Sequence, residues 1–310
     1  MSGAPAEDPG SASGPRFSVI IPTHQSRDYV LAAIRCALGQ TVSDLEVVVL
    51  DNGSTDGTTE AVSAIDDPRL IYRWQEDSGL PADSRNKALA LASGQWACFL
   101  DADDTWVPSK LERVAAVIDA DPDVTMVAHD VRMVDTTGSV IKRRGYALDD
   151  RPLYDQLLYR GNFLTTSATC VRRDAIGMAG GFDTRADYFT VEDYDLWLRI
   201  AETGARLAMI NEPLGDFLVH AASASSKLVR NYDALMRVYD DHALRRAAEG
   251  ALDVEAMVHR RRRARLAEVR DLARGGDITD AVRIAAALPG ELRDARRRYL
   301  AASGDAGDAS

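Results

Sequence analysis

The sequence predicts an α/β fold in which a mostly parallel sheet carries helices on both faces, followed by a C-terminal helical appendage. Through roughly the first hundred positions, short apolar runs alternate with helical patterns at intervals of about 25–30 residues, as consecutive βαβ units do. From about Lys227 onward, long helical patterns replace this alternation. These two observations predict one sheet-based domain with a smaller helical region behind it.

Four apolar runs in the first half are predicted as strands, because each is short and is stopped by proline, aspartate or another turn-forming residue. They cover residues 17–22, 45–50, 70–74 and 96–100. Between them, apolar residues recur at helical spacing, which predicts helices over 28–40, near 61–65 and over 84–92. Asp28 is a suitable N-cap for the first of these helices.

The second half alternates less strictly. A helix is predicted over 108–119 and a strand over 124–134, whereas residues 142–159 fit no single pattern. A helix at 199–203 and a strand at 207–210 are expected next. The alternation therefore weakens without ending.

Three long helical patterns follow, and Gly275-Gly276 and Pro289-Gly290 are expected to separate them. Stretches rich in Ser, Gly, Ala and Asp at both ends are expected to be disordered. The expected organisation is a tail at 1–15, a sheet domain at 16–226, a helical appendage at 227–301 and a tail at 302–310.

Composition excludes several classes of protein. The 310 residues are 46% hydrophobic and 27% charged, which suits a globular protein with a substantial core. A formal net charge of −11 argues against nucleic acid, or an anionic membrane surface, as the main partner. No stretch approaches the roughly 18 apolar residues of a membrane span, so we expect no transmembrane segment.

Cysteine usage points to a reducing compartment. Cys36, Cys98 and Cys170 lie in apolar surroundings and show no metal-like spacing. Such a sparse, odd set is typical of buried thiols. Residues 1–15 lack the basic and apolar regions of a secretory signal, so we expect a cytoplasmic protein.

The most informative motif is Asp101-Ala102-Asp103-Asp104, which follows directly on a predicted buried strand. In open α/β sheets, ligands bind beyond the carboxyl ends of the strands. Neighbouring carboxylates repel one another and are tolerated where a hard cation such as Mn²⁺ or Mg²⁺ neutralises them. Since such a cation commonly also holds a phosphate, the motif predicts a metal–diphosphate site.

Five further segments accompany this motif in a fixed order. They are Ile21-Pro22-Thr23, residues 49–57, residues 77–86, Gly180-Gly181-Phe182-Asp183 and residues 192–199. In this order and spacing, the six segments resemble the family 2 glycosyltransferases, which are inverting enzymes of the Rossmann-like GT-A fold. The resemblance covers approximately residues 16–225. It implies transfer of a sugar from a nucleoside-diphosphate donor to an acceptor hydroxyl.

The resemblance implies a nucleotide pocket along the first strand ends. Pro22 and Thr23 would line it, and the pair Asp51 and Asn52 would contact the base and ribose. Many members that use UDP-sugars carry two aspartates where this chain has Asp51 and Asn52. Because an amide offers a different donor and acceptor pattern, the identity of the base stays open. Arg85 matches the family arginine near the base and diphosphate.

The resemblance also assigns the metal and the catalytic base. Asp101, with its neighbour Ala102, would face the ribose and sugar, and Asp103 would bind Mn²⁺ or Mg²⁺. His220 matches a histidine near the metal and diphosphate. Asp193 matches the base, which must take a proton from the acceptor hydroxyl as it attacks.

Two other functions stay open at this point. Residues 101–105 also fit the DxDxT pattern of haloacid-dehalogenase-like phosphohydrolases, in which Asp101 would be the nucleophile and Asp103 the acid/base. That motif normally lies on the first strand, whereas other strands precede it here. The second alternative is a non-catalytic nucleotide-sugar binding module, against which the intact Asp193 argues.

Several features point to no single role. Glu192 and Asp195 can serve as first-turn acids of a helix. The basic runs at 142–144 and 260–263 are interpreted as solvated or ion-paired surface. The acceptor is unknown and would be a glycan precursor, a natural product or a peptide. The C-terminal helices would form a homodimer, hold the acceptor or cap the core.

Overall fold

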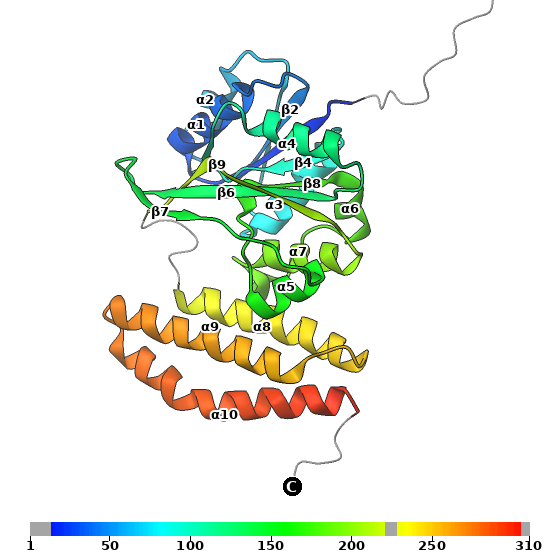
Figure 1. Cartoon of the computed structure of the whole chain (residues 1–310). Helices are drawn as coiled ribbons and strands as arrows, with labels where there is room; N and C mark the ends of the chain where they lie inside the picture. Colours follow the sequence, from blue (N-terminus) through cyan, green and yellow to red (C-terminus); the bar gives the residue numbers. More distant parts are fainter. Residues whose placement is uncertain (1–13, 221–227, 305–310) are drawn as a thin grey trace, which may run out of the picture.

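The computed structural model describes residues 14–220 and 228–304, and one nine-stranded sheet runs through the first of these ranges (Figure 1). Most of the two expected tails and the expected domain boundary at 226 lie outside the described residues. The strands are β1 (Phe17–Thr23), β2 (Leu45–Asn52), β3 (Leu70–Gln75), β4 (Trp96–Phe99), β5 (Thr105–Trp106), β6 (Met126–Val134), β7 (Val140–Arg144), β8 (Thr169–Arg172) and β9 (Leu207–Leu218).

The sheet has a parallel half and a mixed half. Its order is β3-β2-β1-β4-β8-β6-β9-β5, with β7 paired to β6 as a hairpin. The first four strands are all parallel, as predicted, so the polar ends of β1, β2 and β4 meet at one edge. Beyond β4 the direction changes, because β8 pairs antiparallel with both β4 and β6, while β6 and β9 are parallel.

Helices cover both faces of the sheet, and alternate residues of the strands supply the two cores. Val19 and Ile21 of β1 belong to one hydrophobic cluster, and Ile20 belongs to the other. The first face is covered by α1 (Arg27–Leu38), α2 (Thr58–Ser63) and α4 (Lys110–Ala120). The second is covered by α3 (Pro81–Leu91), α5 (Leu153–Arg160), α6 (Arg173–Met178) and α7 (Glu192–Glu202).

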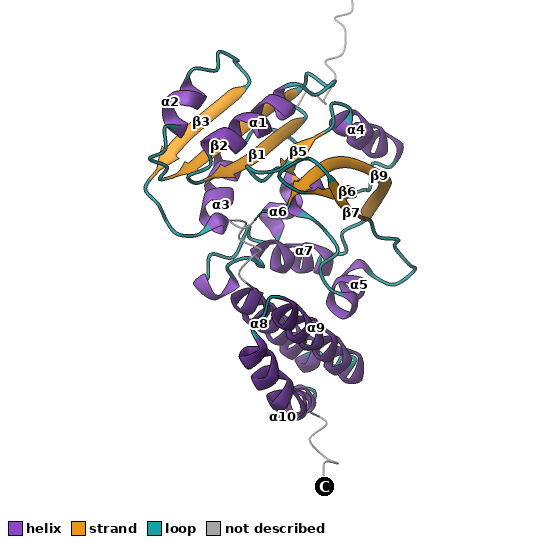
Figure 2. Cartoon of the chain, turned by 90° about the vertical axis from the view of Figure 1, so that its left-hand side faces the viewer, coloured by secondary structure: helices purple, strands orange, loops and turns teal. Residues whose placement is uncertain are grey.

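The appendage consists of three helices, as the sequence predicted: α8 (Leu228–Ala248), α9 (Val254–Arg274) and α10 (Ile278–Ala302). They lie beneath α5 and α7 (Figure 2). Buried residues from all three helices belong to the same cluster as α7 and the sheet. The rings of Tyr194 on α7 and Tyr239 on α8 meet edge to face, with centroids 6.1 Å apart. The appendage therefore shares the core of the sheet domain.

Two sequence expectations change in detail. Gly275-Gly276 separates α9 from α10, but α10 continues through Pro289, where a break was expected. A proline removes one helical hydrogen bond and bends the helix. Leu288 and Tyr299, on either side of Pro289, are both buried, and this packing holds α10 together. Residues 142–159, which fitted no pattern, contain the end of β7 and most of α5.

None of the helices in the two described ranges is both long and apolar enough to cross a membrane. Cys98 and Cys170 are register partners on β4 and β8, and both are free thiols in the core.

Candidate active site

The acidic motif forms a turn directly after β4, at the edge where the parallel strands end. The turn is closed by a hydrogen bond from the Asp104 amide to the carbonyl of Asp101, with N and O 3.1 Å apart. The amide of Asp101 also donates to the hydroxyl of Ser167, at 3.0 Å. Ser167 lies in a short 3₁₀ turn, Thr166–Ala168, directly before β8. The antiparallel strand β8 therefore brings this turn against the acidic motif.

Arg85 on α3 joins two groups of carboxylates that are far apart in the sequence. Its Nη2 lies 2.7 Å from Oδ1 of Asp101, and its Nη1 lies 2.6 Å from Oε1 of Glu192 at the start of α7. The Arg85 side chain is 8% exposed and Glu192 is 7% exposed. Buried carboxylates of this kind require a compensating cation. Arg85 was expected near the nucleotide, and here it holds the two acidic segments together.

Asp193 follows Glu192 and is only half-buried, with one side-chain partner among the described residues. The Thr166 hydroxyl donates to its Oδ2 at 2.8 Å, and the backbone amide of Tyr194 donates to its Oδ1 at 2.6 Å. Burial by the surrounding protein and the neighbouring Glu192 raise the pKa of Asp193 to about 6, although Thr166 and Arg85 act in the opposite direction. A carboxylate with such a pKa is suited to accept a proton near neutral pH.

Asp195, two positions further along α7, has more partners. Its Oδ1 lies 3.0 Å from Nε2 of His242 on α8, and its Oδ2 lies 2.7 Å from Nη2 of Arg199. Burial acts to raise the pKa of Asp195, but the hydrogen bonds from His242 and Arg199 hold it below its usual range. Asp195 is therefore a structural carboxylate that links α7 to the appendage.

The two predicted metal ligands lie together. Nε2 of His220 is 2.9 Å from Oδ2 of Asp103, and the ring of Tyr29 stacks on the His220 ring at 5.4 Å. Oδ1 of Asp104 accepts a hydrogen bond from the Leu218 amide at 2.9 Å, which fixes the end of β9 two residues before His220. Burial and the nearby Asp101 raise the pKa of Asp103, and the hydrogen bond with His220 opposes this shift.

This donor set fits Mn²⁺ or Mg²⁺ bound together with a substrate. Carboxylate and imidazole are suitable ligands, and Mg²⁺ commonly uses one or two protein carboxylates plus substrate phosphates and water. Within the described residues, no group of three or more His, Cys, Asp or Glu side chains could hold a metal by itself. Asp103 and His220 are therefore the residues that would hold such a cation, with the remaining ligands coming from the substrate and water.

The predicted nucleotide side lies at the ends of β1 and β2. Thr23 is opposite Asp51 in the register of the two strands, and the buried Thr23 hydroxyl has no hydrogen-bond partner among the residues that the structure describes. Asp51 is fully buried. Its Oδ1 accepts from the Ser54 amide at 2.9 Å and its Oδ2 from the Tyr72 hydroxyl at 2.7 Å. Asp51 thus shapes its own loop, and in this conformation its carboxylate faces the protein.

Asn52, like Asp51, forms hydrogen bonds with a neighbouring loop. Its Nδ2 donates to Oδ1 of Asp77 at 2.6 Å, and its Oδ1 accepts from Nε2 of Gln75 at 2.6 Å and from the Ser78 amide at 3.0 Å. An aspartate at position 52 could not donate to Asp77. The asparagine is therefore matched to the loop 75–79, in which Asp77 is exposed. Whether Asp51 and Asn52 reach a bound base stays a prediction.

Ala102 and Arg144 also lie close to the carboxylates of the site. Ala102 is buried within the acidic turn, between Asp101 and Asp103. Arg144 at the end of β7 lies close enough to Asp193 to interact with it electrostatically. Sequence reasoning did not find Thr166, Ser167 or Arg144, because their relation to Asp101 and Asp193 arises only from the path of β7 and β8. The basic run at 142–144 was the one available signal.

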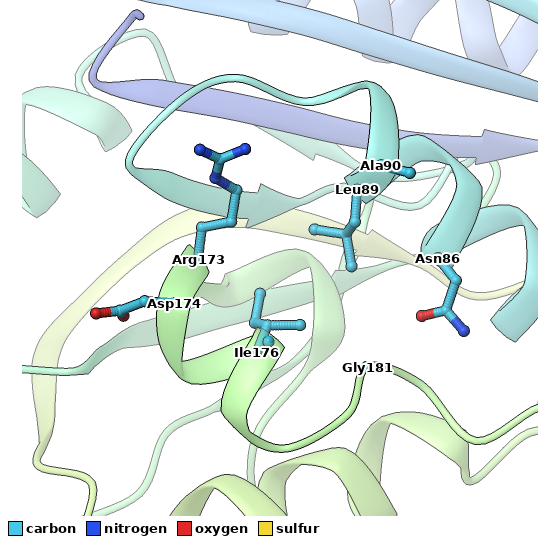
Figure 3. Close-up of a pocket in the computed structure, with 8 residues that line it drawn as sticks. Asn86, Leu89, Ala90, Arg173, Asp174, Ile176 and Gly181 are labelled. Carbon is cyan, nitrogen blue, oxygen red and sulfur yellow. The ribbon is translucent and has the colours of Figure 1, made fainter. Parts of the chain in front are cut away.

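A separate hollow of about 510 Å³ lies between α3 and α6 (Figure 3). Its lining includes Leu89 and Ile176, with Arg173 and Asp174 at one side. Asn86, at the other side, exchanges two hydrogen bonds with the backbone of Phe182, both at 2.8 Å. None of the predicted site residues lines this hollow.

Comparison with known proteins points to one family and one fold. Residues 18–178, more than half of the chain, match the model of the family described as glycosyl transferase family 2. An uncharacterized glycosyltransferase of Nostoc sp. is 32% identical over 172 residues, which is 52% of this chain and 52% of that protein. The chain thus spans about half the length of this relative.

Two solved structures share the fold. The Staphylococcus aureus TarS fragment 1–349 in complex with UDP-GlcNAc has a TM-score of 0.63 at 18% identity, with 93% of this chain and 89% of that chain covered. A mannosyltransferase from Pyrobaculum calidifontis in complex with GDP-Man and Mn²⁺ has a TM-score of 0.57 at 21% identity, with 97% and 90% covered. Both alignments extend over the sheet domain and the C-terminal helices.

Proposed function

Because the chain belongs to glycosyl transferase family 2 and is a glycosyltransferase of the GT-A fold, we propose that it performs metal-dependent, inverting transfer of a sugar. The donor is a nucleoside-diphosphate sugar and the acceptor is a hydroxyl group. One observation carries the proposal: Arg85 brings the Asp101–Asp103 motif and the Glu192–Asp193 pair into one site. Donor activation and proton removal each need carboxylates, and this arrangement supplies both side by side.

Asp193 is the proposed base. As the acceptor oxygen attacks the anomeric carbon, its proton passes to the Asp193 carboxylate, and the bond from that carbon to the diphosphate oxygen breaks on the opposite side. The Thr166 hydroxyl orients Asp193 through Oδ2, and Oδ1 is hydrogen-bonded to the α7 backbone. Arg144 adds positive charge beside the reacting groups. Glu192, paired with Arg85, keeps α7 against the acidic turn.

Asp103 and His220 would hold the cation, Mn²⁺ or Mg²⁺. When bound, it neutralises the negative charge that develops on the leaving diphosphate. Asp101 is expected to face the ribose and sugar, with Ala102 beside it. The Mn²⁺ and GDP-Man bound to the Pyrobaculum enzyme support this part of the proposal.

Pro22, Thr23, Asp51 and Asn52 form the proposed nucleotide wall. The Thr23 hydroxyl, which has no partner within residues 14–220 and 228–304, offers a hydrogen bond to the nucleotide. Relatives with this fold are known in complex with UDP-GlcNAc and with GDP-Man, so both a uracil and a guanine base are candidates. The loop that Asn52 holds at 75–79 borders this wall and would select between them.

For the acceptor we propose a chemical class, and for the protein a cellular compartment. The acceptor is a glycan precursor, a natural product or a peptide that carries a free hydroxyl. The free thiols of Cys98 and Cys170, which face each other across two strands, support a reducing, cytoplasmic setting. A homodimer through the C-terminal helices would have to use the outer faces of α9 and α10, because α8 packs against α7.

The haloacid-dehalogenase alternative has no support in the site. Asp101, its required nucleophile, is ion-paired with Arg85 and lies after β4, in the middle of the sheet. A direct test incubates the protein and Mn²⁺ with UDP-GlcNAc or GDP-mannose and, separately, with p-nitrophenyl phosphate. Slow release of nucleoside diphosphate in the first assay alone is expected, with water as the acceptor of the sugar, and release of nitrophenol alone would contradict the proposal.

The metal site has its own test. UDP or GDP should bind tighter with Mn²⁺ than with EDTA, and Asp103→Ala should remove that gain while the fold stays intact. Asp119→Ala, at an exposed carboxylate that pairs with Arg16, is the matched control and should keep it. Identical calorimetric titrations of the unmodified protein with and without Mn²⁺ would refute the metal assignment.

A further inference from the structure

We propose that helix α8 of the appendage positions the catalytic base, with Asn231 and His242 as the positioning residues. The inference rests on the proposed role of Asp193. It gives the C-terminal helices a part in the reaction, although they contribute no residue that touches the substrate.

The first observation is a strained residue just before α7. Thr190 has a φ of 78°, which places a β-branched side chain in the left-handed region. Such a conformation persists only where the surroundings enforce it, and it is characteristic of functional segments. The Thr190 hydroxyl lies 2.7 Å from Oδ1 of Asn231 on α8. Asn231 therefore helps to hold the strained turn from which α7 begins.

The second observation is the buried contact between Asp195 and His242. Nδ1 of His242 lies 3.1 Å from the Tyr154 hydroxyl and 2.7 Å from Nη2 of Arg245. These groups can donate to Nδ1, which leaves Nε2 to donate to Asp195 at 3.0 Å. The His242 side chain is 2% exposed and that of Asp195 is 5% exposed. This contact fixes the rotation of α7 about its axis.

Helix geometry connects the two carboxylates. Residues two positions apart on an α-helix project about 200° from each other. Since Asp195 is held against α8, Asp193 is turned to the opposite side, where Thr166 and Arg85 lie. A helix is stiff over such a short length, so the orientation of one side chain sets that of the other.

Two more contacts show that α8 holds the whole segment. The Tyr188 hydroxyl donates to Oδ2 of Asp241 at 2.6 Å, and Tyr194 packs against Tyr239. Residues 188–195 are thus anchored to α8 at four points, two before Asp193 and two after it. A helix that served only to hold an acceptor or a second copy would have no need of these contacts.

The test uses paired variants of the full chain. Asn231→Ala and His242→Leu remove the contacts, whereas Asn231→Asp keeps an acceptor for Thr190 and His242→Gln keeps a donor for Asp195. Tyr232→Phe is the control, because it removes a hydrogen bond between α8 and α9 that does not involve α7. Hydrogen–deuterium exchange of residues 188–196 is measured for each, together with UDP affinity in Mn²⁺.

We expect faster exchange in residues 188–196 for Asn231→Ala and for His242→Leu, and for none of the other variants. Their UDP affinity should stay within about twofold of that of the unmodified protein. With the nucleotide-sugar that supports turnover, kcat of these two variants should fall about 10- to 100-fold, since misplacing a catalytic group by about 1 Å has costs of this order. KM for the nucleotide-sugar should change little. Asn231→Asp and His242→Gln should restore most of the slow exchange and most of kcat.

Exchange at 188–196 that is unchanged in the disruptive variants, or raised equally by Tyr232→Phe, would overturn the positioning role. A kcat loss that His242→Gln does not recover would do the same. Failure of the proposed base is seen separately, because full activity in Asp193→Asn would remove the catalytic assignment and leave the exchange result intact.

Discussion

Asp193 and Asp195 lie two positions apart on α7, yet the two sides of this helix provide opposite environments. The side that faces the strand ends gives Asp193 one hydroxyl partner and an acidic neighbour, and its pKa is raised to about 6. The side that faces the appendage gives Asp195 an imidazole and a guanidinium, and its pKa is held low.

The difference shows that the partners of a carboxylate, more than its burial, decide what it can do. Burial acts in the same direction on both residues. A base must be able to take up a proton, so it is left with few partners, whereas a structural carboxylate must stay charged and is given many. The four predictions that follow test this contrast, from the largest expected effect to the smallest.

Asp193→Asn should lower the rate of sugar transfer about 10²- to 10⁴-fold, because the amide cannot accept the proton. The affinity for UDP in Mn²⁺ and the free energy of unfolding should stay close to those of the unmodified protein. Single-turnover transfer, calorimetry and urea unfolding measure the three quantities. Transfer at the original rate would point to Glu192 as the base instead.

Asp195→Ala should act mainly on stability. It leaves His242 and Arg199 without their buried partner, and breaking a buried ion pair in this way costs about 3–5 kcal/mol. Urea unfolding should show this loss. A variant with unaltered stability and strongly reduced transfer would reverse the roles assigned to the two carboxylates.

The two carboxylates should also respond oppositely to pH. Transfer should decline as pH falls through about 6, by roughly tenfold per unit below it, because Asp193 must be deprotonated to act. Its raised pKa contributes stability that is present at low pH and is lost as pH rises through about 6. The lowered pKa of Asp195 contributes stability that is present above the unfolded-state pKa and is lost on acidification. A transfer rate that is flat between pH 5 and pH 8 would exclude Asp193 as the base.

Thr166→Val should have the smallest effect. The hydroxyl stabilises the charged form of Asp193, so its removal should move the midpoint of the pH–rate profile upward by about one unit, the equivalent of about 1.4 kcal/mol. The matched variant Thr166→Ser should keep the original midpoint. A downward movement would mean that the hydroxyl stabilises the protonated acid.

The sequence predicted the parts of the site that local patterns encode. Local patterns predicted the four parallel strands, the acidic turn after β4 and the first residues of α7, because each depends on a short run of neighbouring residues. A buried strand that ends in carboxylates indicates a ligand site at the edge of a sheet. The family resemblance implied a place near the metal for both Asp103 and His220, and these residues, more than a hundred positions apart, lie 2.9 Å from each other.

The missed contacts have a common physical origin. Thr166 and Arg144 reach Asp193 through β8 and β7, strands in the mixed half of the sheet, whose pairing no periodicity reveals. Asp51 and Asn52 were found by motif, but their hydrogen bonds with Tyr72 and Asp77 depend on tertiary structure. Pro289 was expected to end a helix because proline disfavours helix interiors. The helix continues, since residues on both sides of Pro289 are buried against the other helices.

The environment of Asn52 has a consequence for the lifetime of the protein. Asn52 precedes Gly53, and an Asn-Gly pair in a mobile chain deamidates readily, because the glycine nitrogen can attack the side-chain amide. In the folded protein both polar atoms of that amide are engaged, and Gly53 is fixed at a φ of 81°. We therefore expect the fold to protect Asn52 from ageing and each unfolding event to expose it. Mass spectrometry of peptides from folded and urea-treated samples stored side by side would show this, and equal deamidation in both would mean that the hydrogen bonds give no protection.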